Sequence, residues 1–281
     1  MSIIQALILG LLQGLTEFLP VSSSGHLILA QSIFGLDQVA LKGFDIAINA
    51  GTLLAVFIYF RKDFGELILA ALQTIGIGTA VKADELKTRQ RLILMLLLGT
   101  IPAVLVGLLL GDWLDAHFLN AVTVPVLLIL VAFIFLIAER IYEKSQRRKE
   151  VNMKSGLIIG CAQALALMPG VSRSGATITA GLLLGVEREK AARYSFLLGS
   201  VAITAATVFA FYKGIKGEYS FPAPDVLIAG ILSSFVAGMA AISFLLNYLK
   251  KHSLAVFAYY RIFIAVAFMI WFYTVGRGMS L

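Results

Sequence analysis

Six stretches of this chain are apolar over a length that can cross a membrane, and this pattern constrains the fold more than any other feature. They are residues 44–60, 92–111, 121–138, 194–212, 225–246 and 254–275. A helix needs about 17–25 apolar residues to cross the hydrocarbon core of a bilayer. The chain is 59% hydrophobic and only 14% charged, whereas about 25% of the residues in a soluble domain are charged. We therefore predict a multi-pass, all-α membrane protein with six transmembrane helices.

Two further apolar regions, 3–34 and 155–184, are each interrupted in the middle by small and polar residues. The first break is Pro-Val-Ser-Ser-Ser-Gly at 20–25, and the second is Pro-Gly-Val-Ser-Arg-Ser-Gly at 169–175. Each arm on either side of a break is too short to span a membrane by itself. Because non-helical backbone at membrane depth must lie against protein or a water-filled cavity, we predict two re-entrant helical hairpins.

The two interrupted regions also share a sequence. A shift of 150 residues aligns LILGLLQGLTEFLPVSSSGHLILA (7–30) with LIIGCAQALALMPGVSRSGATITA (157–180), and 11 of the 24 positions are identical. Each half then has one hairpin followed by three spans, and because three is odd the second half must be inverted. We predict a single membrane domain, 1–281, made of two inverted repeats at about 1–140 and 150–281, with the two breaks facing each other.

The basic residues indicate how the chain is oriented. Lys and Arg gather in four segments: 61–91, 139–154, 185–193 and 247–253. By contrast, residues 1–41 and 112–120 contain no Lys or Arg. Short cytoplasmic loops are enriched in Lys and Arg, so we place the four basic segments in the cytoplasm, although Lys213 and Lys216 argue mildly the other way. The net charge of +7 therefore reflects membrane topology and does not indicate a nucleic-acid partner.

The two breaks carry the residues that can perform chemistry. Glu17, His26 and Arg173 lie in or beside them, and ionisable residues inside a membrane are usually functional. Six hydroxyl side chains accompany them: Ser22, Ser23, Ser24, Ser172, Ser174 and Thr177. A guanidinium group can bind two phosphate oxygens at once, and Gly-containing turns at helix starts direct backbone N–H groups at anions. A hydroxyl beside an imidazole can act as a nucleophile with its base. This set favours a phosphate-binding site.

Two segments, QGLTEFLPVSSSGH (13–26) and PGVSRSGAT (169–177), resemble the two signature motifs of the bacterial undecaprenyl-diphosphate phosphatase family, the bacitracin-resistance type. The resemblance covers essentially the whole chain and includes FDIAINAG at 44–51. It implies hydrolysis of the C55 isoprenoid lipid diphosphate to the monophosphate, which recycles the lipid carrier for peptidoglycan synthesis and confers bacitracin resistance. It also implies a bacterial plasma (inner) membrane location. With the basic segments in the cytoplasm the first hairpin enters from outside, so we expect the active site to open toward the outer leaflet.

The resemblance assigns site residues by motif position. They are Gln13, Glu17, Ser23, His26, Ser172, Arg173, Ser174 and Thr177. We expect Ser23 to attack the terminal phosphorus while His26 assists the proton transfer, with a water activated by Glu17 or His26 as the alternative.

The remaining polar residues of the motifs are expected to bind the substrate. They are Gln13, Ser22, Ser172, Arg173, Ser174 and Thr177. Glu17 either orients the attacking group or holds a divalent cation, Mg²⁺ or Ca²⁺, since both ions prefer oxygen ligands. Gln13 is Glu in many family members, so this chain lacks a second carboxylate at that position.

Several polar residues outside the motifs carry weaker expectations. Asp45 and Asn49, one helical turn apart, could border the site. Gln163 corresponds to Gln13 in the repeat and could bind in the site or pack beside it. Arg261, between Tyr260 and Ile262, is expected to anchor a helix near the cytoplasmic face.

Two other functions compete with hydrolysis. Inverted repeats with broken helices are typical of transporters, so a lipid flippase or a small-anion transporter is the alternative. The other membrane lipid-phosphatase superfamily is excluded, because no Lys or Arg precedes His26 and the histidine after Arg173 is His252, 79 residues later (252 − 173). The sequence leaves open whether the chain acts as a monomer or a homodimer, and which isoprenoid length it prefers.

Overall fold

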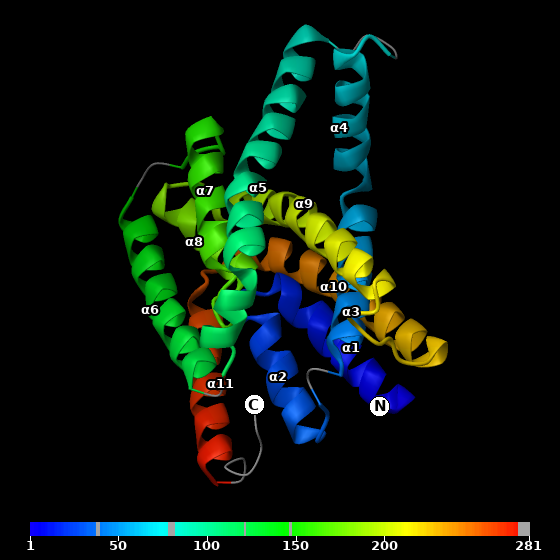
Figure 1. The fold of residues 1–281 in the computed structure, drawn as a ribbon. Helices are drawn as coiled ribbons and strands as arrows, with labels where there is room; N and C mark the ends of the chain where they lie inside the picture. Colours follow the sequence, from blue (N-terminus) through cyan, green and yellow to red (C-terminus); the bar gives the residue numbers. More distant parts are fainter. Residues whose placement is uncertain (38–39, 78–81, 121, 146–147, 275–281) are drawn as a thin grey trace.

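The structure, a computed structural model, describes residues 1–37, 40–77, 82–120, 122–145 and 148–274. These residues form α-helices joined by short turns (Figure 1). The helices are α1 (Ile3–Phe18), α2 (Ser23–Ile33), α3 (Lys42–Tyr59), α4 (Arg61–Thr74), α5 (Ala83–Phe118), α6 (Thr123–Lys144), α7 (Met153–Leu165), α8 (Arg173–Leu183), α9 (Arg188–Ile215), α10 (Pro224–Leu249) and α11 (Ala255–Thr274).

Six of the described helices are long and apolar enough to cross a membrane: α3, α5, α6, α9, α10 and α11. They coincide with the six apolar stretches, so the prediction of an all-α, multi-pass protein is confirmed. Segment 61–91 differs from expectation, because it was predicted as a loop and instead holds α4 and the start of α5, which project together from the bundle (Figure 1). This segment is too rich in charged residues to be found by a search for apolar stretches of spanning length. Its two helices contact each other through an ion pair between Arg89 of α5 and Glu66 of α4 at 3.5 Å.

Each interrupted region forms two helices separated by a sharp break. Ser22 and Ser172, which precede α2 and α8, have φ angles of 75° and 76°. Among the described residues they are the two non-glycine residues with positive φ, a conformation that is costly for a side chain with a Cβ. They are equivalent in the repeat (22 + 150 = 172), so the same unusual backbone occurs in both halves. The breaks lie where the sequence predicts them, an arrangement consistent with two re-entrant hairpins.

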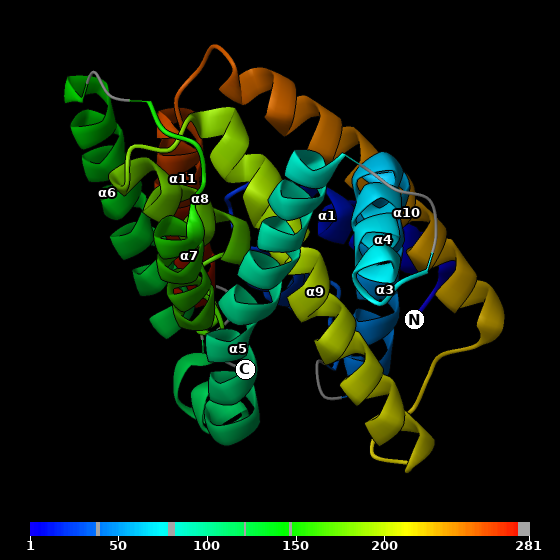
Figure 2. The same ribbon diagram turned by 90° about the horizontal axis from the view of Figure 1, so that it is seen from above.

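The two halves interlock. Helix α1 packs along α10 of the second half, and α7 packs along α5 of the first half (Figures 1 and 2). A Cβ on Gly10 would lie 2.3 Å from the Gly230 oxygen, and a Cβ on Gly160 would lie 2.3 Å from the Gly99 oxygen. Gly10 and Gly160 are repeat equivalents, so glycine allows the same close backbone approach twice. Each broken helix pair is therefore held by helices of the opposite half.

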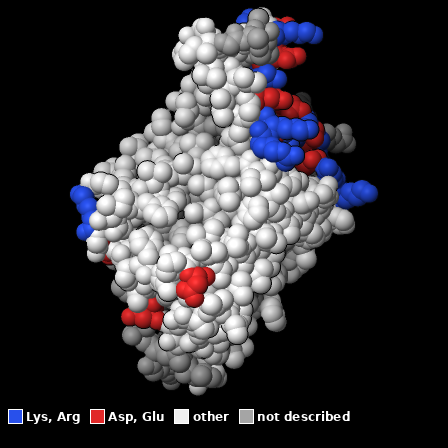
Figure 3. Space-filling view, turned by 90° about the vertical axis from the view of Figure 1, so that its right-hand side faces the viewer, with Lys and Arg blue, Asp and Glu red and all other residues white. Residues whose placement is uncertain are grey.

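The four basic segments meet at one end of the bundle, as the sequence predicts. Ion pairs connect them to one another: Arg193 with Asp63, Arg188 with Glu139, Lys190 with Glu150, and Lys250 with Glu189. On the face drawn in Figure 3, most Lys and Arg side chains gather where α4 and the start of α5 project, and the broad middle of the surface is uncharged. The distribution separates a basic end from an apolar belt, as expected for a membrane protein.

Candidate active site

A cavity of about 290 Å³ lies between the two breaks. Its walls come from both halves of the chain: Glu17 of α1 and Ser22–Ser24 on one side, and segment 166–169 with Ser172 and Arg173 on the other. The prediction that the two Ser–Gly stretches face each other is therefore confirmed. Because α2 and α8 both begin at this cavity, their N-terminal ends create a region of positive potential that suits an anion.

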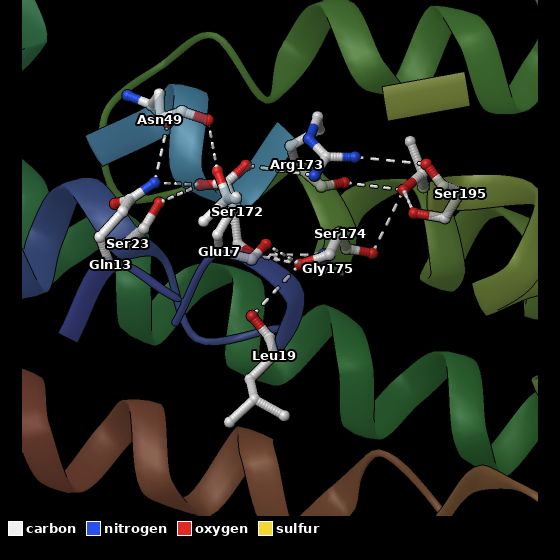
Figure 4. A network of polar contacts seen from close by, with 12 residues as sticks. Gln13, Glu17, Leu19, Ser23, Asn49, Ser172, Arg173, Ser174, Gly175 and Ser195 are labelled. Atoms are coloured by element: carbon white, nitrogen blue, oxygen red, sulfur yellow. Dashed lines mark hydrogen bonds and ion pairs between the residues drawn. The ribbon is translucent and has the colours of Figure 1, made fainter. Parts of the chain in front are cut away.

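Glu17 is the centre of a polar network in this cavity (Figure 4). Its Oε1 accepts a hydrogen bond from Nη2 of Arg173 at 3.1 Å, and its Oε2 accepts one from the Ser23 hydroxyl at 2.7 Å. The two charged side chains are 14% (Arg173) and 11% (Glu17) exposed. One carboxylate thus connects a hydroxyl of the first break to a guanidinium of the second. In a partly desolvated site, such charge-assisted hydrogen bonds are strong.

Arg173 has room to extend because of a glycine. A Cβ on Gly199 of α9 would lie 1.5 Å from Nη1 of Arg173, so the guanidinium occupies the space that any side chain at position 199 would need. The same Nη1 donates to the Ser195 carbonyl at 3.2 Å. The Nε of Arg173 is buried and has no partner among the described residues. This unused donor belongs to the planar fork with which arginine binds phosphate oxygens.

Gln13 extends the network away from the cavity. Its Nε2 donates to Oδ1 of Asn49 at 2.8 Å and to Oε2 of Glu17 at 3.2 Å, so Asn49 of α3 joins the site. Asp45 instead accepts from Gln31 at 2.8 Å. Gln163, the repeat equivalent of Gln13, is buried, and its amide oxygen and nitrogen have no hydrogen-bond partner among the described residues. The two halves therefore differ, and the network is centred on the residues of the first half.

His26 lies away from the position expected for a base acting on Ser23. Its Nδ1 is 2.7 Å from the Ser22 carbonyl oxygen and its Nε2 is 2.8 Å from the Tyr260 hydroxyl. A carbonyl oxygen can only accept, so Nδ1 carries a proton and donates it to Ser22, while Nε2 faces the Tyr260 hydroxyl. Both nitrogens are thus engaged, and the group that contacts the Ser23 hydroxyl is Glu17.

Ser174 and Thr177 face the protein interior. Both are fully buried and neither lines the cavity. Ser174 donates to the Leu19 carbonyl at 3.2 Å, and Thr177 donates to the Arg173 carbonyl at 2.7 Å. The hydroxyl groups expected to bind phosphate here instead join the two breaks and hold the start of α8. Ser172, by contrast, lines the cavity, as do Ser22, Ser23 and Ser24.

Comparisons with known proteins identify the family to which this architecture belongs. A family described as bacitracin resistance protein BacA matches residues 6–267. The chain belongs to this family. It is 39% identical over 271 residues to the undecaprenyl-diphosphatase of Thermodesulfovibrio yellowstonii, covering 96% of this chain and 97% of the relative. It is 40% identical over 266 residues to that of Rubrobacter xylanophilus, covering 94% and 96%. It is 40% identical over 275 residues to that of Idiomarina loihiensis, covering 97% and 100%.

A metal ion in this BacA family site would find few protein ligands. Within the part of the chain that the structure describes, no three His, Cys, Asp or Glu side chains gather to hold a metal. Glu17 is the acidic residue that lines the cavity, and both its oxygens already accept hydrogen bonds. These residues fit a cation only if the phosphate oxygens of a substrate supply most of its ligands, as is common for Mg²⁺.

Two residues that matter for the BacA family site were missed by sequence reasoning. Gly199 leaves the space that the Arg173 side chain occupies. The repeat could have pointed to this residue, because Gly199 is the repeat equivalent of Asn49 (49 + 150 = 199). Tyr260, which holds His26, carries no local signal because it lies 234 residues away.

Proposed function

We propose that this BacA family protein is an undecaprenyl-diphosphatase, which hydrolyses an isoprenoid lipid diphosphate to the lipid monophosphate and phosphate. The proposal is supported by the names of its relatives and above all by one contact, the 2.7 Å hydrogen bond from the Ser23 hydroxyl to Glu17. That contact places a nucleophile beside a proton acceptor at the edge of an anion site. In the cell, the reaction would return the lipid carrier to peptidoglycan synthesis and so confer resistance to bacitracin.

The diphosphate head group binds where the two breaks meet. Arg173 offers the buried Nε–H that has no partner in the described protein, and Nη2, which now contacts Glu17, can turn to a phosphate oxygen. The starts of α2 and α8 add backbone donors, because the first N–H groups of a helix lack intrahelical partners. Among the described residues, no side chain caps α2, which leaves those N–H groups to the phosphate.

Ser23 is the nucleophile in this proposal and Glu17 is its base. The Ser23 oxygen bonds to the terminal phosphorus as its proton passes to Glu17, and the bond from that phosphorus to the bridging oxygen breaks. Glu17 returns the proton to the lipid phosphate as it leaves. Water then attacks the phosphoserine, gives its proton to Glu17 and releases phosphate, and the proton returns to Ser23. Glu17 thus takes the role expected of His26, which instead supports the first break through Ser22.

Replacing Ser23 tests this assignment. Ser23→Ala should retain less than a tenth of the wild-type kcat for phosphate release from undecaprenyl diphosphate, a barrier increase of at least about 1.4 kcal/mol. Thr88→Val, which removes an exposed hydroxyl at the start of α5, is the matched control and should keep full activity. Greater residual activity in Ser23→Ala would favour direct attack by a water activated by Glu17, with Ser23 only binding phosphate. A wild-type protein without any phosphatase activity would overturn the function itself.

A divalent cation, Mg²⁺ or Ca²⁺, is the cofactor we propose; Glu17 would be its single carboxylate ligand, as the alternative to its role as the base. The ion would offset the negative charge of the diphosphate, the main electrostatic demand of phosphoryl transfer. Phosphate release measured with and without a chelator checks this proposal, and activity unchanged by the chelator would refute it.

The isoprenoid chain leaves the polar cavity along a groove of about 220 Å³ between α5 and α9. Leu167 lines both the cavity and this groove, so the two lie next to each other. Ala202 and Ala206, which line the groove, follow Gly199 by three and seven residues, so they lie on the same face of α9. Because Arg173 packs against Gly199, a lipid whose phosphates bind Arg173 meets this row of small residues next.

The site opens toward the outer leaflet of the bacterial plasma membrane. Leu119, which lines the cavity, follows the last turn of α5, whereas the basic residues of α5 lie near its first turn. The cavity is therefore closer to the end of α5 that carries few cations, and the basic end of a membrane protein faces the cytoplasm. Hydrolysis would then act on carrier lipid that has delivered its cargo outside.

A further inference from the structure

Arg261 of α11 is fully buried, which contradicts its expected role as an interfacial anchor. Its guanidinium donates to three backbone carbonyls: Nε to Leu128 at 3.2 Å, Nη1 to Pro20 at 3.4 Å and Nη2 to Gly170 at 2.8 Å. Phe135 of α6 covers the group, with 5.2 Å from the guanidinium carbon to the ring centroid. No described carboxylate forms an ion pair with it. A buried charge is costly without strong partners, so these carbonyls are the groups that stabilise it.

Two of the three carbonyls belong to equivalent positions of the repeat. Pro20 lies in the first break and Gly170 lies in the second (20 + 150 = 170). Where a helix is interrupted, carbonyl groups lose their intrahelical partners and must be satisfied by protein when water is scarce. One side chain supplies this partner to both breaks at once. The repeat therefore places two unsatisfied carbonyls close together, and α11 provides the single cation between them.

We propose that Arg261 is a positioning residue that clamps the two breaks to each other and thereby sets the placement of Ser23 relative to Arg173. Ser23 follows Pro20 by three residues and Arg173 follows Gly170 by three residues, so each reactive group is one short step from a clamped carbonyl. Tyr260, the preceding residue, holds His26 of α2 at 2.8 Å and strengthens the hold of α11 on the first break. The consequence for catalysis rests on the proposed phosphatase function, whereas the clamp itself does not.

Arginine is required here for a geometric reason. Its rigid planar fork points N–H groups in several directions at once, whereas the lysine ammonium is a compact charge on a flexible stem. Arg261→Lys keeps the charge but cannot reach three diverging carbonyls, so it should behave like Arg261→Gln rather than like the wild type. A residue that merely supplied positive charge would be replaced well by lysine.

Kinetics and stability measured together distinguish positioning from general destabilisation. We expect Arg261→Lys and Arg261→Gln to lower kcat for undecaprenyl diphosphate at least tenfold while KM changes less than threefold, because Ser23 and Arg173 themselves remain. Glu139→Gln is the control: Glu139 is also buried and accepts from Arg188 and from the Leu254 N–H, and none of these three residues lines the cavity. It should lower the melting temperature in detergent without lowering kcat at a temperature well below the transition.

A distance measurement tests the clamp without reference to activity. Ile33 and Leu183 are the last residues of α2 and α8, both are exposed, and they are repeat equivalents (33 + 150 = 183). Spin labels on cysteines at these two positions, in a Cys161→Ser background, report the distance between the helices that follow the breaks. The distance distribution should be narrow in wild type and in Glu139→Gln, and it should broaden or shift in both Arg261 variants.

The outcomes separate the clamp from the proposed function. A lowered kcat together with a broadened distance distribution supports the proposal. The clamp is overturned if Arg261→Lys keeps more than half of the wild-type kcat, or if the distance distribution stays as narrow as in Glu139→Gln. If the wild type shows no phosphatase activity, the proposed function fails, and the distances alone then decide on the clamp. Should Arg261→Gln fail to fold, Arg261→Lys carries both measurements.

Discussion

Gly199→Ala should remove activity without harming the fold, because position 199 is a helical residue whose missing side chain makes room for Arg173. The new Cβ would lie 1.5 Å from Nη1 and 2.3 Å from Cζ of the guanidinium. Non-bonded heavy atoms settle at about 3.5 Å, so the guanidinium must move by about 2 Å. This exceeds what the 3.1 Å contact with Glu17 and the 3.2 Å contact with Ser195 can absorb.

The size of the loss follows from that displacement. A misplacement of about 1 Å can cost about 100-fold in rate, so we expect kcat/KM to fall at least about 100-fold, or about 2.7 kcal/mol of transition-state stabilisation. The free energy of unfolding should not fall with the activity, because alanine is favoured over glycine in a helix interior by about 1 kcal/mol. A variant that is as stable as the wild type and nearly inactive is therefore the expected result.

Phosphate release and thermal unfolding in the same detergent measure both quantities. Gly65→Ala in α4 is the matched control, since a Cβ there meets no atom within 4 Å and should leave activity unchanged. Arg173→Ala and the double variant Arg173→Ala/Gly199→Ala should be equally inactive, because both changes act on the same guanidinium. If Gly199→Ala kept more than a third of wild-type kcat/KM, the position of Arg173 would not matter for catalysis and the argument would fail.

Two further predictions concern the head group and the lipid chain. Arg173→Lys keeps the charge but loses the planar fork, so kcat/KM should fall at least about tenfold, a loss of about 1.4 kcal/mol, and near-wild-type activity would reduce Arg173 to a topology anchor. Ala202→Leu narrows the α5–α9 groove and should raise KM for undecaprenyl diphosphate more than for farnesyl diphosphate. Ala162→Leu narrows the neighbouring apolar groove between α6, α7 and α8 and should not discriminate between the two lipids. If Ala202→Leu and Ala162→Leu changed KM equally for undecaprenyl and farnesyl diphosphate, the proposed path of the lipid chain would be refuted.

The parts of the fold that sequence could predict are those set by local composition and by the repeat. Spanning length identified six helices, and the shift of 150 residues predicted that the breaks at 20–25 and 169–175 face each other. The helical hairpin of α4 and the start of α5 was missed, because it extends beyond the apolar stretches and its charged residues resemble those of a loop. Contacts between the two helices, such as Arg89 with Glu66 and Gln90 with Thr74, join residues that no single short window of sequence contains.

The site was predictable in its members but not in the direction of its side chains. Glu17, Ser23 and Arg173 converge as the motifs suggest, whereas Ser174 and Thr177 turn inward although they stand in the same motif. The backbone at the start of α8 matches that at the start of α2, yet Ser24 lines the cavity whereas Ser174 donates to the Leu19 carbonyl of the first break. The partner of Ser174 is 155 residues away in the chain, so the local pattern cannot show which hydroxyl turns inward.

The interlocking of the halves has a consequence for how the chain is made. Helix α1 ends at Phe18 and its partner α10 begins at Pro224, 206 residues later (224 − 18). At about 5–20 residues per second, the ribosome needs about 10–40 s to deliver that partner. Until then the face of α1 around Gly10 has only lipid or a temporary protein neighbour to cover it. Arg261, which holds both breaks, is translated later still. A nascent chain therefore carries every cavity-lining side chain for many seconds without a formed catalytic cavity, and full-length synthesis precedes the first turnover.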